Sequence, residues 1–268
     1  GGVEVSMDAI LRIPVAGLHL ASMPPYSTPS TVDEFRANYQ AVTERIANAA
    51  HAAGRDPADI RLIAVSKTFP ISHALLAAEA GMTVLGENRP QELAEKAQAF
   101  RTRGVDVTWC AIGHLQRNKA KEIAQFAAEF HALDSLRLAE ALQHRLELAN
   151  RTLDVFIQVN TSHEAQKSGF APDEVAAILP SLATLDRLRV RGLMTMAAFS
   201  PEESVVRPSF EQLRTLRDQL QPDAPDGMSL TELSMGMTGD FEWAIAEGAT
   251  SVRIGTAIFG HRPDSAYL

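Results

Sequence analysis

The stretch Arg61-Leu-Ile-Ala-Val-Ser-Lys-Thr-Phe-Pro70 decides how the rest of the chain is interpreted. Its first half is a short, almost unbroken apolar run, which is typical of a strand buried on both faces in a parallel sheet. The run ends at Ser66 and Lys67, and Pro70 then opens a helical pattern. Lys67 is therefore expected at the carboxyl end of a buried strand, where barrels of alternating strands and helices carry their functional groups.

Strand-like and helical patterns alternate from this stretch to the end of the chain. Strands are predicted at 62–66, 83–85, 107–111, 130–133, 154–159, 188–194, 230–233 and 251–254. Helices are predicted between them at 71–80, 91–103, 118–126, 135–149, 172–183, 209–221 and 239–247, while 201–208 and 222–227 are expected to be surface loops. Eight such units in this length favour a closed (β/α)₈ TIM barrel over an open doubly wound sheet.

An additional helix precedes the first strand. It is expected to start at Thr31 or Asp33 and to end near Gly54, and to plug or flank the barrel. Residues 1–31 carry several prolines and no sustained period, so we expect a poorly ordered extension followed by one barrel domain over 32–268.

Composition limits the classes of function. The chain has 268 residues and a formal net charge of −8, which argues against a general nucleic-acid or membrane-surface role. The single cysteine, Cys110, excludes an internal disulfide and is expected to be a buried structural thiol. We expect a cytoplasmic protein, because no secretory signal and no bilayer-spanning stretch is evident. No histidine pair has the spacing of a metal site.

Lys67 suggests amine chemistry. Burial disfavours the charged form of a lysine, and a neutral amine can attack an aldehyde to form a Schiff base. A strand-end lysine that only reaches solvent explains the same sequence. Asn88, after the second strand, is placed either to hold a ring substituent or to cap the next helix.

The last two strand ends suggest an anion site. Loops after strands seven and eight of such barrels often bind phosphate. The hydroxyls of Ser234 and Thr256, with N–H groups near Gly236 and Gly255, offer neutral donors to a dianion. The glycines are also explained by tight turns alone.

Seven motifs in this order resemble the pyridoxal phosphate homeostasis protein family. They are Ala64-Val-Ser-Lys-Thr68, Gly86-Glu-Asn88, Ile112-Gly-His-Leu-Gln-Arg-Asn-Lys119, Lys167-Ser-Gly169, Arg191-Gly-Leu-Met194, Leu233-Ser-Met-Gly-Met237 and Val252-Arg-Ile-Gly-Thr-Ala-Ile-Phe-Gly260. The resemblance implies a barrel similar to the N-terminal domain of alanine racemase, with pyridoxal 5'-phosphate held covalently. Two departures are Thr238, where relatives often have serine, and His114, where some have proline.

The resemblance also implies roles for individual residues. Lys67 is expected to form the Schiff base and Asn88 to neighbour the cofactor ring. Ser234, Gly255 and Thr256 are expected to hold the phosphate, and Arg253 to face the pyridine nitrogen. An arginine there keeps that nitrogen unprotonated, which weakens the ring as an electron sink.

We therefore expect a carrier that stores, buffers or delivers pyridoxal phosphate, possessing no catalytic residues and acting as a monomer with apo-enzymes as partners. Alanine racemases use a tyrosine from a second domain as a second base, whereas Tyr26, Tyr39 and Tyr267 lie outside the predicted strand ends. Two alternatives stay open. One is a racemase-type enzyme that uses His114, His163 or Lys167 as that base, although each is explained equally by a surface role. The other is a Schiff-base aldolase that acts on a phosphorylated sugar.

Overall fold

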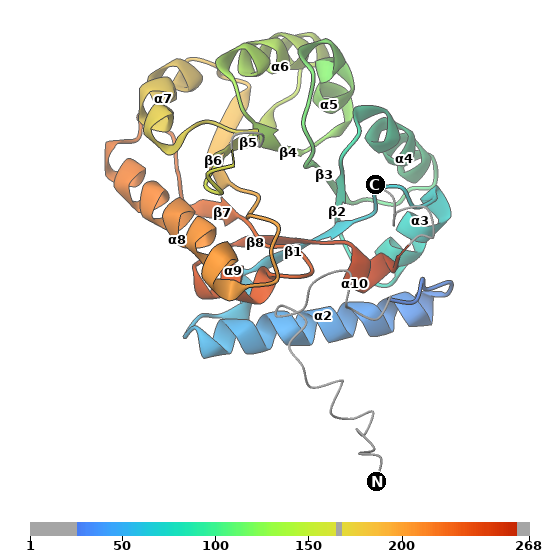
Figure 1. The fold of residues 1–268 in the computed structure, drawn as a ribbon. Coiled ribbons are helices and arrows are strands. Elements are labelled where there is room, and N and C mark those ends of the chain that lie inside the picture. The colour runs from blue at the N-terminus through green and yellow to red at the C-terminus, as the bar shows by residue number, and fades with distance from the viewer. Residues whose placement is uncertain (1–25, 165–167, 262–268) are drawn as a thin grey trace.

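The structure, a computed structural model, describes residues 26–164 and 168–261. Its strands form one closed parallel barrel, ordered as they occur in the chain (Figure 1). They are β1 (Arg61–Val65), β2 (Val84–Glu87), β3 (Thr108–Ala111), β4 (Glu129–Leu133), β5 (Leu153–Gln158), β6 (Leu188–Met194), β7 (Glu232–Ser234) and β8 (Ser251–Ile254). The predicted TIM barrel is confirmed.

The barrel closes where β1 pairs with β8 on one side and β2 on the other. Ala64 lies opposite Ile254, and Val65 lies opposite Gly86. A β-carbon at Gly86 would lie 2.9 Å from the Ile63 side chain, so only glycine fits at this point of the packed wall. The register brings the carboxyl ends of β8, β1 and β2 side by side at one rim of the barrel.

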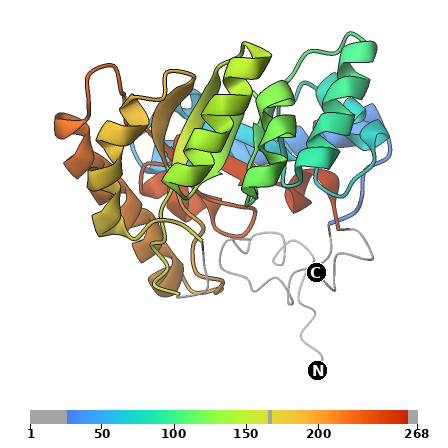
Figure 2. The same ribbon diagram turned by 90° about the horizontal axis from the view of Figure 1, so that it is seen from above.

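Helices surround the barrel on the outside (Figure 2). After α2 (Val32–Ala52) the α-helices are α3 (Ile71–Glu79), α4 (Pro90–Thr102), α5 (Ala120–Phe126), α6 (Leu136–Ala149), α7 (Val175–Ala183), α8 (Glu203–Leu220), α9 (Phe241–Ala246) and α10 (Thr256–Phe259). Short 3₁₀ turns lie at Pro57–Asp59, Arg117–Lys119, Pro172–Glu174 and Gln221–Asp223. Apolar side chains on the inner faces of the helices and on the strands form a continuous core.

The additional helix α2 flanks the barrel rather than plugging it (Figure 1). The Thr31 hydroxyl accepts from the N–H of Glu34, which caps its first turn. On the other side, α2 packs against the end of the chain. Asn38 donates to the carbonyl of Ile258 at 2.9 Å, and Arg45 pairs with Glu242 at 2.5 Å. The helix α2 therefore packs on α9 and on the four-residue α10, the two helices on either side of β8 in the chain.

The prediction for 201–208 was wrong, because α8 already begins at Glu203. Pro208 lies inside α8, and a proline there normally disfavours a helix because it lacks the backbone N–H that would donate to the preceding turn. Here Val206 and Phe210 are buried on the inner face, and Arg207 bridges Glu203 and Glu247. Tertiary packing thus outweighs the local cost of the proline.

The first residues of the described chain contact its last ones. The N–H of His261 donates to the carbonyl of Tyr26 at 3.2 Å, and the Thr28 hydroxyl donates to the carbonyl of His261 at 3.1 Å. Of the poorly ordered extension expected over 1–31, residues 26–31 are described and make these contacts. Residues 1–25 lie outside the described part of the chain.

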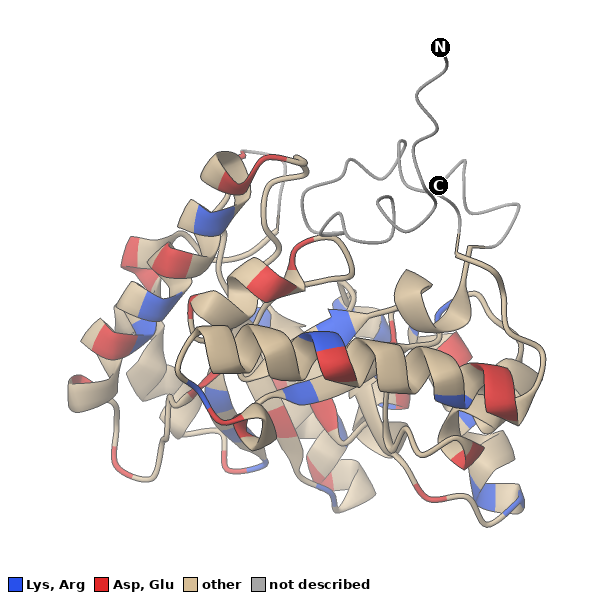
Figure 3. Ribbon diagram, turned by 90° about the horizontal axis from the view of Figure 1, so that it is seen from below, with Lys and Arg blue, Asp and Glu red and all other residues tan. Residues whose placement is uncertain are grey.

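The outer helices carry charges of both signs. In the view of Figure 3, acidic and basic residues are interspersed over the same outer helices. Among residues 26–164 and 168–261, none of the helices combines the length and the apolar character needed to cross a bilayer.

Candidate functional site

Four neighbouring strands bring the predicted site residues to one rim. Ser234 ends β7, Gly255 and Thr256 follow β8, Lys67 comes two residues after β1, and Asn88 comes directly after β2. Because β7, β8, β1 and β2 are consecutive in a closed parallel barrel, their carboxyl ends lie together. The alternation of the sequence was sufficient to predict this grouping.

Lys67 lies at the tip of a tight turn and is exposed. The N–H of Phe69 donates to the carbonyl of Ser66 at 3.1 Å, and Thr68 takes a left-handed conformation with φ of 69°. Because Ser66 and Phe69 are both buried, the turn directs the residue between them away from the core. Of the two explanations that the sequence left open, the structure has the lysine that reaches solvent, where a ligand can approach it.

The turn after β7 approaches α9 closely. Gly236 has φ of 104°, and a β-carbon there would lie 2.8 Å from that of Ala244. Two residues on, the Thr238 side chain is 5% exposed, and its Oγ1 has no hydrogen-bond partner among the described residues. A buried hydroxyl without a partner costs free energy, so this hydroxyl is available to donate a hydrogen bond to an oxygen of a ligand.

The Ser234 hydroxyl is directed into the barrel instead. It lies 2.8 Å from Nδ1 of His131, and Nε2 of His131 lies 2.9 Å from a carboxylate oxygen of Glu129. Because an ionised carboxylate only accepts, Nε2 carries the proton, Nδ1 is an acceptor and the serine must donate to it. The predicted phosphate donor is thus occupied, and Thr238 is the hydroxyl at the rim.

Arg253 is enclosed on the inner side of β8. It is 3% exposed, its Nη2 donates to the carbonyl of Thr195 at 2.9 Å, and its Nε has no partner among the described residues. Burial lowers the pKa of its guanidinium to about 10, and Asp240 opposes that shift. The group therefore stays charged at neutral pH and has an N–H to spare.

Asn88 is half-buried and is not a helix cap. The N-cap position of α4 belongs to Arg89, which makes no side-chain capping bond. A β-carbon at Gly113 would lie 2.6 Å from the carbonyl oxygen of Asn88, so the loop after β3 lies directly against it. The capping explanation for Asn88 is excluded, and the interpretation as a ring neighbour stays a prediction.

Thr256 and Gly255 lie next to the end of β1. Thr256 is half-buried and is the first residue of α10, so its N–H has no acceptor within that helix. A β-carbon at Gly255 would lie 3.4 Å from the carbonyl oxygen of Val65. Their closeness to the strand that leads to Lys67 agrees with a ligand held between these segments.

The histidines that the sequence offered as a base are otherwise placed. His114 is exposed, with Nδ1 3.3 Å from a carboxylate oxygen of Asp134. His163 is exposed with φ of 60°. Lys167 lies outside the described residues.

One buried cluster has the composition of a metal site but not its chemistry. Single ligand atoms of Cys110, Glu129 and His131 lie within 4.8 Å of one another. However, both carboxylate oxygens of Glu129 are bound by the guanidinium of Arg61, at 2.5 and 2.7 Å. Burial also raises the pKa of the Cys110 thiol, which keeps it protonated. Cys110 is thus the buried structural thiol that was expected.

A second charged cluster was missed from the sequence. Lys96 of α4 is 2% exposed and contacts Glu87, at the end of β2, and Glu92 on its own helix. The spacing of Glu92 and Lys96 is that of a surface ion pair on a helix, which is how such a pattern is normally interpreted. The sequence did offer one sign of this cluster, because Glu87 is an acidic residue at the end of a strand that was predicted to be buried.

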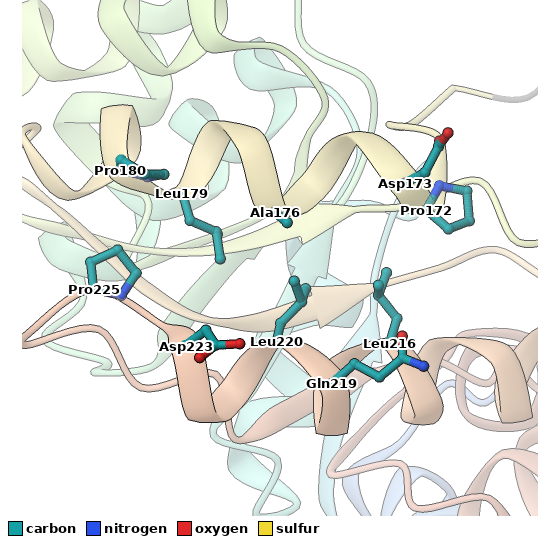
Figure 4. Close-up of a pocket in the computed structure, with 10 residues that line it drawn as sticks. All are labelled: Pro172, Asp173, Ala176, Leu179, Pro180, Leu216, Gln219, Leu220, Asp223 and Pro225. Carbon is teal, nitrogen blue, oxygen red and sulfur yellow. The ribbon is translucent and has the colours of Figure 1, made fainter.

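One groove on the outside of the barrel lies away from this rim. A groove of about 370 Å³ runs between α7 and α8 on the outside of the barrel (Figure 4). It is lined by side chains such as Leu179, Leu216 and Leu220, and contains none of the predicted site residues. The rim remains the better candidate.

Comparison with known proteins identifies the family. The sequence model of the alanine racemase N-terminal domain matches residues 33–263. The pyridoxal phosphate homeostasis protein of Pseudomonas aeruginosa is 41% identical over 233 residues, which cover 87% of this chain and 96% of that protein. The chain belongs to the pyridoxal phosphate homeostasis protein family. A family member from Escherichia coli K12 is 40% identical over 232 residues, covering 86% of this chain and 98% of that protein.

Solved structures of similar proteins have the same fold as this chain. PipY of Synechococcus elongatus, in a structure with pyridoxal phosphate bound, is 36% identical with a TM-score of 0.71, covering 82% of this chain and all of that one. A Bifidobacterium adolescentis protein is 38% identical with a TM-score of 0.79, covering 85% and 95%. Alanine racemase of Clostridium difficile, at 18% identity and a TM-score of 0.65, covers 90% of this chain and 59% of that one, and shares the fold alone.

Proposed function

We propose that this chain binds pyridoxal 5'-phosphate at the β7–β8–β1–β2 rim, with Lys67 as the attachment residue, and serves homeostasis of that cofactor. The observation that carries the proposal is the shared rim: the exposed Lys67 follows β1, the neighbouring strand β8 carries Arg253, and β7 leads to the unpartnered hydroxyl of Thr238. The family name and the PipY structure with the cofactor bound support it.

The residues present fit this cofactor. When bound, pyridoxal phosphate supplies an aldehyde that condenses with a primary amine, forming a carbon–nitrogen double bond and releasing water. Lys67 offers the amine. Thr238, Thr256 and the backbone at Gly255 offer neutral donors to a phosphate, and Asn88 lies beside the attachment strand.

Arg253 favours holding the cofactor over carbanion chemistry. Its pKa of about 10 keeps the guanidinium charged at neutral pH, and a guanidinium only donates hydrogen bonds. Facing the pyridine nitrogen, it would leave that nitrogen unprotonated. Stabilisation of a carbanion by the ring would be correspondingly weak.

The described residues that the sequence offered as a second base are not placed as one. His114 engages Asp134, and His163 is exposed. Tyr39 lies on α2 and Tyr26 packs near Arg45, both outside the strand ends. General acid–base catalysis contributes about 10²–10⁴-fold, so the placement of these four described residues supports a carrier over a racemase, and Lys167 is the candidate base that the structure does not describe.

The decisive experiment is a visible absorption spectrum of purified protein loaded with pyridoxal phosphate. We expect a visible absorption band from the carbon–nitrogen double bond that the aldehyde forms with an amine. Borohydride reduction followed by peptide mapping should place the cofactor on Lys67. Lys67→Ala should abolish the band, whereas Lys121→Ala, which removes another exposed lysine, should keep it. A band that persists in Lys67→Ala would refute the assignment.

Two further measurements separate the alternatives. A colourless protein that instead binds phosphorylated sugars would favour the aldolase. Catalytic exchange of the α-hydrogen for deuterium across a panel of amino acids would exclude the carrier in favour of a racemase-type enzyme. A carrier should instead restore activity to an apo-enzyme that needs pyridoxal phosphate, and should sediment as a monomer.

A further inference from the structure

Two peptide groups flank Lys67, and both are held by α4. The carbonyl of Ser66, which belongs to the peptide before Lys67, accepts from Nζ of Lys96 at 2.8 Å. The N–H of Thr68, which belongs to the peptide after Lys67, donates to Oε2 of Glu92 at 2.8 Å. The same oxygen of Glu92 accepts from Lys96 at 3.0 Å, so a single ion pair contacts both peptides.

Glu87 completes this arrangement from β2. Its side chain is fully buried, and its Oε1 accepts from Nζ of Lys96. The ammonium of Lys96 thus donates to two carboxylates and one carbonyl, which satisfies its three N–H groups. We call Glu87, Glu92 and Lys96 the α4 clamp.

The turn that the α4 clamp holds is strained. Thr68 has φ of 69°, a conformation that costs a residue other than glycine on the order of 1–2 kcal/mol and is least favourable for β-branched side chains. A hydrogen bond from its N–H to a carboxylate is about twice as strong as one between neutral groups. Glu92 therefore offsets the strain at the residue that sets the direction of the turn.

Stability alone does not account for the α4 clamp. Moving a lysine and a glutamate out of water costs several kcal/mol per ion, and apolar residues of the same volume often stabilise a fold equally well. What apolar residues cannot do is orient a carbonyl and an N–H on either side of an exposed lysine.

We propose that Glu87, Glu92 and Lys96 are positioning residues, which fix the backbone at Lys67 so that its amine meets the ligand at the rim. This inference rests on the proposed attachment of pyridoxal phosphate to Lys67. None of the three touches the reacting atoms; they act through the two peptide groups. Burial raises the pKa of the Glu87 carboxyl above its usual range, and the charge of Lys96 opposes that shift.

Glu92→Ala is the most informative variant, because Glu92 is partly exposed and its loss leaves Lys96 paired with Glu87. Two probes are compared: pyridoxal phosphate, and pyridoxine phosphate, which carries an alcohol in place of the aldehyde. We expect Glu92→Ala to slow formation of the visible band by about tenfold, as loss of a charge-assisted hydrogen bond suggests. Affinity for pyridoxine phosphate should change by less than about twofold, since the phosphate donors are untouched.

Matched variants separate positioning from a structural role. Glu92→Gln keeps an acceptor for the Thr68 N–H and should restore most of the rate. Glu95→Ala removes an exposed glutamate from the same helix and should match the wild type. Equal losses for both probes, or a wild-type rate in Glu92→Ala, would overturn the inference while leaving the proposed function intact. A wild-type protein that shows no band at all would overturn both.

Discussion

Arg61 on β1 and Glu129 on β4 form a two-point ion pair across the interior of the barrel, with N···O distances of 2.5 and 2.7 Å. Glu129 also accepts from His131, which accepts in turn from Ser234. The interior beneath the rim is thus tied by a polar chain that joins β1, β4 and β7, with the ring of Phe156 stacked on His131 at 4.0 Å.

Removal of one partner of this pair should be costly. Arg61→Met leaves the buried carboxylate of Glu129 with only His131, and we expect a loss of about 3–5 kcal/mol in the free energy of unfolding. The double variant Arg61→Met/Glu129→Met should be less destabilised than the sum of the singles, because no charge is left unpaired. Urea unfolding of the four proteins measures the coupling; strict additivity would contradict the ion pair.

The polar chain also makes stability depend on pH. Burial lowers the pKa of His131 from 6.5 to about 4, with Glu129 opposing the shift and the charges of Arg253 and Arg61 adding to it. The folded protein therefore binds fewer protons than the unfolded chain between these values. The contribution of His131 to the free energy of unfolding is fully present above pH 6.5. It is lost as the pH falls towards 4, by about 3 kcal/mol.

Glu129 extends the same trend. Its hydrogen bonds to His131 and Arg61 outweigh burial and hold its pKa at about 2, so further stability is lost as the pH falls from 4.5. Thermal unfolding followed from pH 7 to 3 should show both losses. His131→Gln, which can still donate to Glu129, should flatten the curve between pH 6.5 and 4, and an unchanged slope in this variant would rule out His131 as the cause.

Substitutions of Thr238 and Ser234 are expected to have opposite effects on cofactor affinity and on stability. Thr238→Val removes the unpartnered rim hydroxyl, so affinity for pyridoxal phosphate should fall by about tenfold while stability is kept, as for one lost hydrogen bond. Ser234→Ala should lower stability, because Nδ1 of His131 loses its donor, and should leave affinity nearly unchanged. Thr238→Ser serves as the control that keeps the hydroxyl. If Ser234→Ala instead lowered the affinity and Thr238→Val did not, Ser234 would be the phosphate-binding hydroxyl, as the sequence predicted.

Gly236 tests the shape of the turn after β7. Gly236→Ala places a β-carbon 2.8 Å from that of Ala244 in a conformation with φ of 104°, so we expect both stability and cofactor affinity to fall. Gly227→Ala is the matched control, because Gly227 has φ of 82° with nothing within 4 Å of the added carbon. It should cost only about 1 kcal/mol of strain and bind the cofactor normally. Isothermal titration and denaturant unfolding of both variants provide the comparison.

The barrel and the grouping of rim residues could be predicted because they follow from periodicity. Buried runs such as Leu62–Val65 alternate with amphipathic helices, and in a parallel barrel every strand delivers its last residue to the same edge. This placed Lys67, Asn88 and Thr256 just after the carboxyl ends of their strands, where the structure has them, without any knowledge of side-chain contacts. The early helix was likewise predicted from its spacing and its Thr31 cap.

Side-chain direction was the part that the sequence could not supply. Ser234 and Thr238 are both hydroxyl residues near the end of β7, and only the positions of His131 and Glu129 decide which one points inward. The exposure of Lys67 depends on the left-handed turn at Thr68, and the burial of Lys96 depends on its contact with a different strand. Each of these requires contacts between residues far apart in the chain.

The position of α2 has a consequence for biosynthesis. Asn38 bonds to a carbonyl 220 residues further along the chain, in the four-residue helix that follows β8. The ribosome therefore makes the two halves of this contact at well separated times. Until α10 emerges, Phe35 of α2 can make its ring contact with His73 of α3 but not the one with Phe259, so the packing of α2 is completed only after β8.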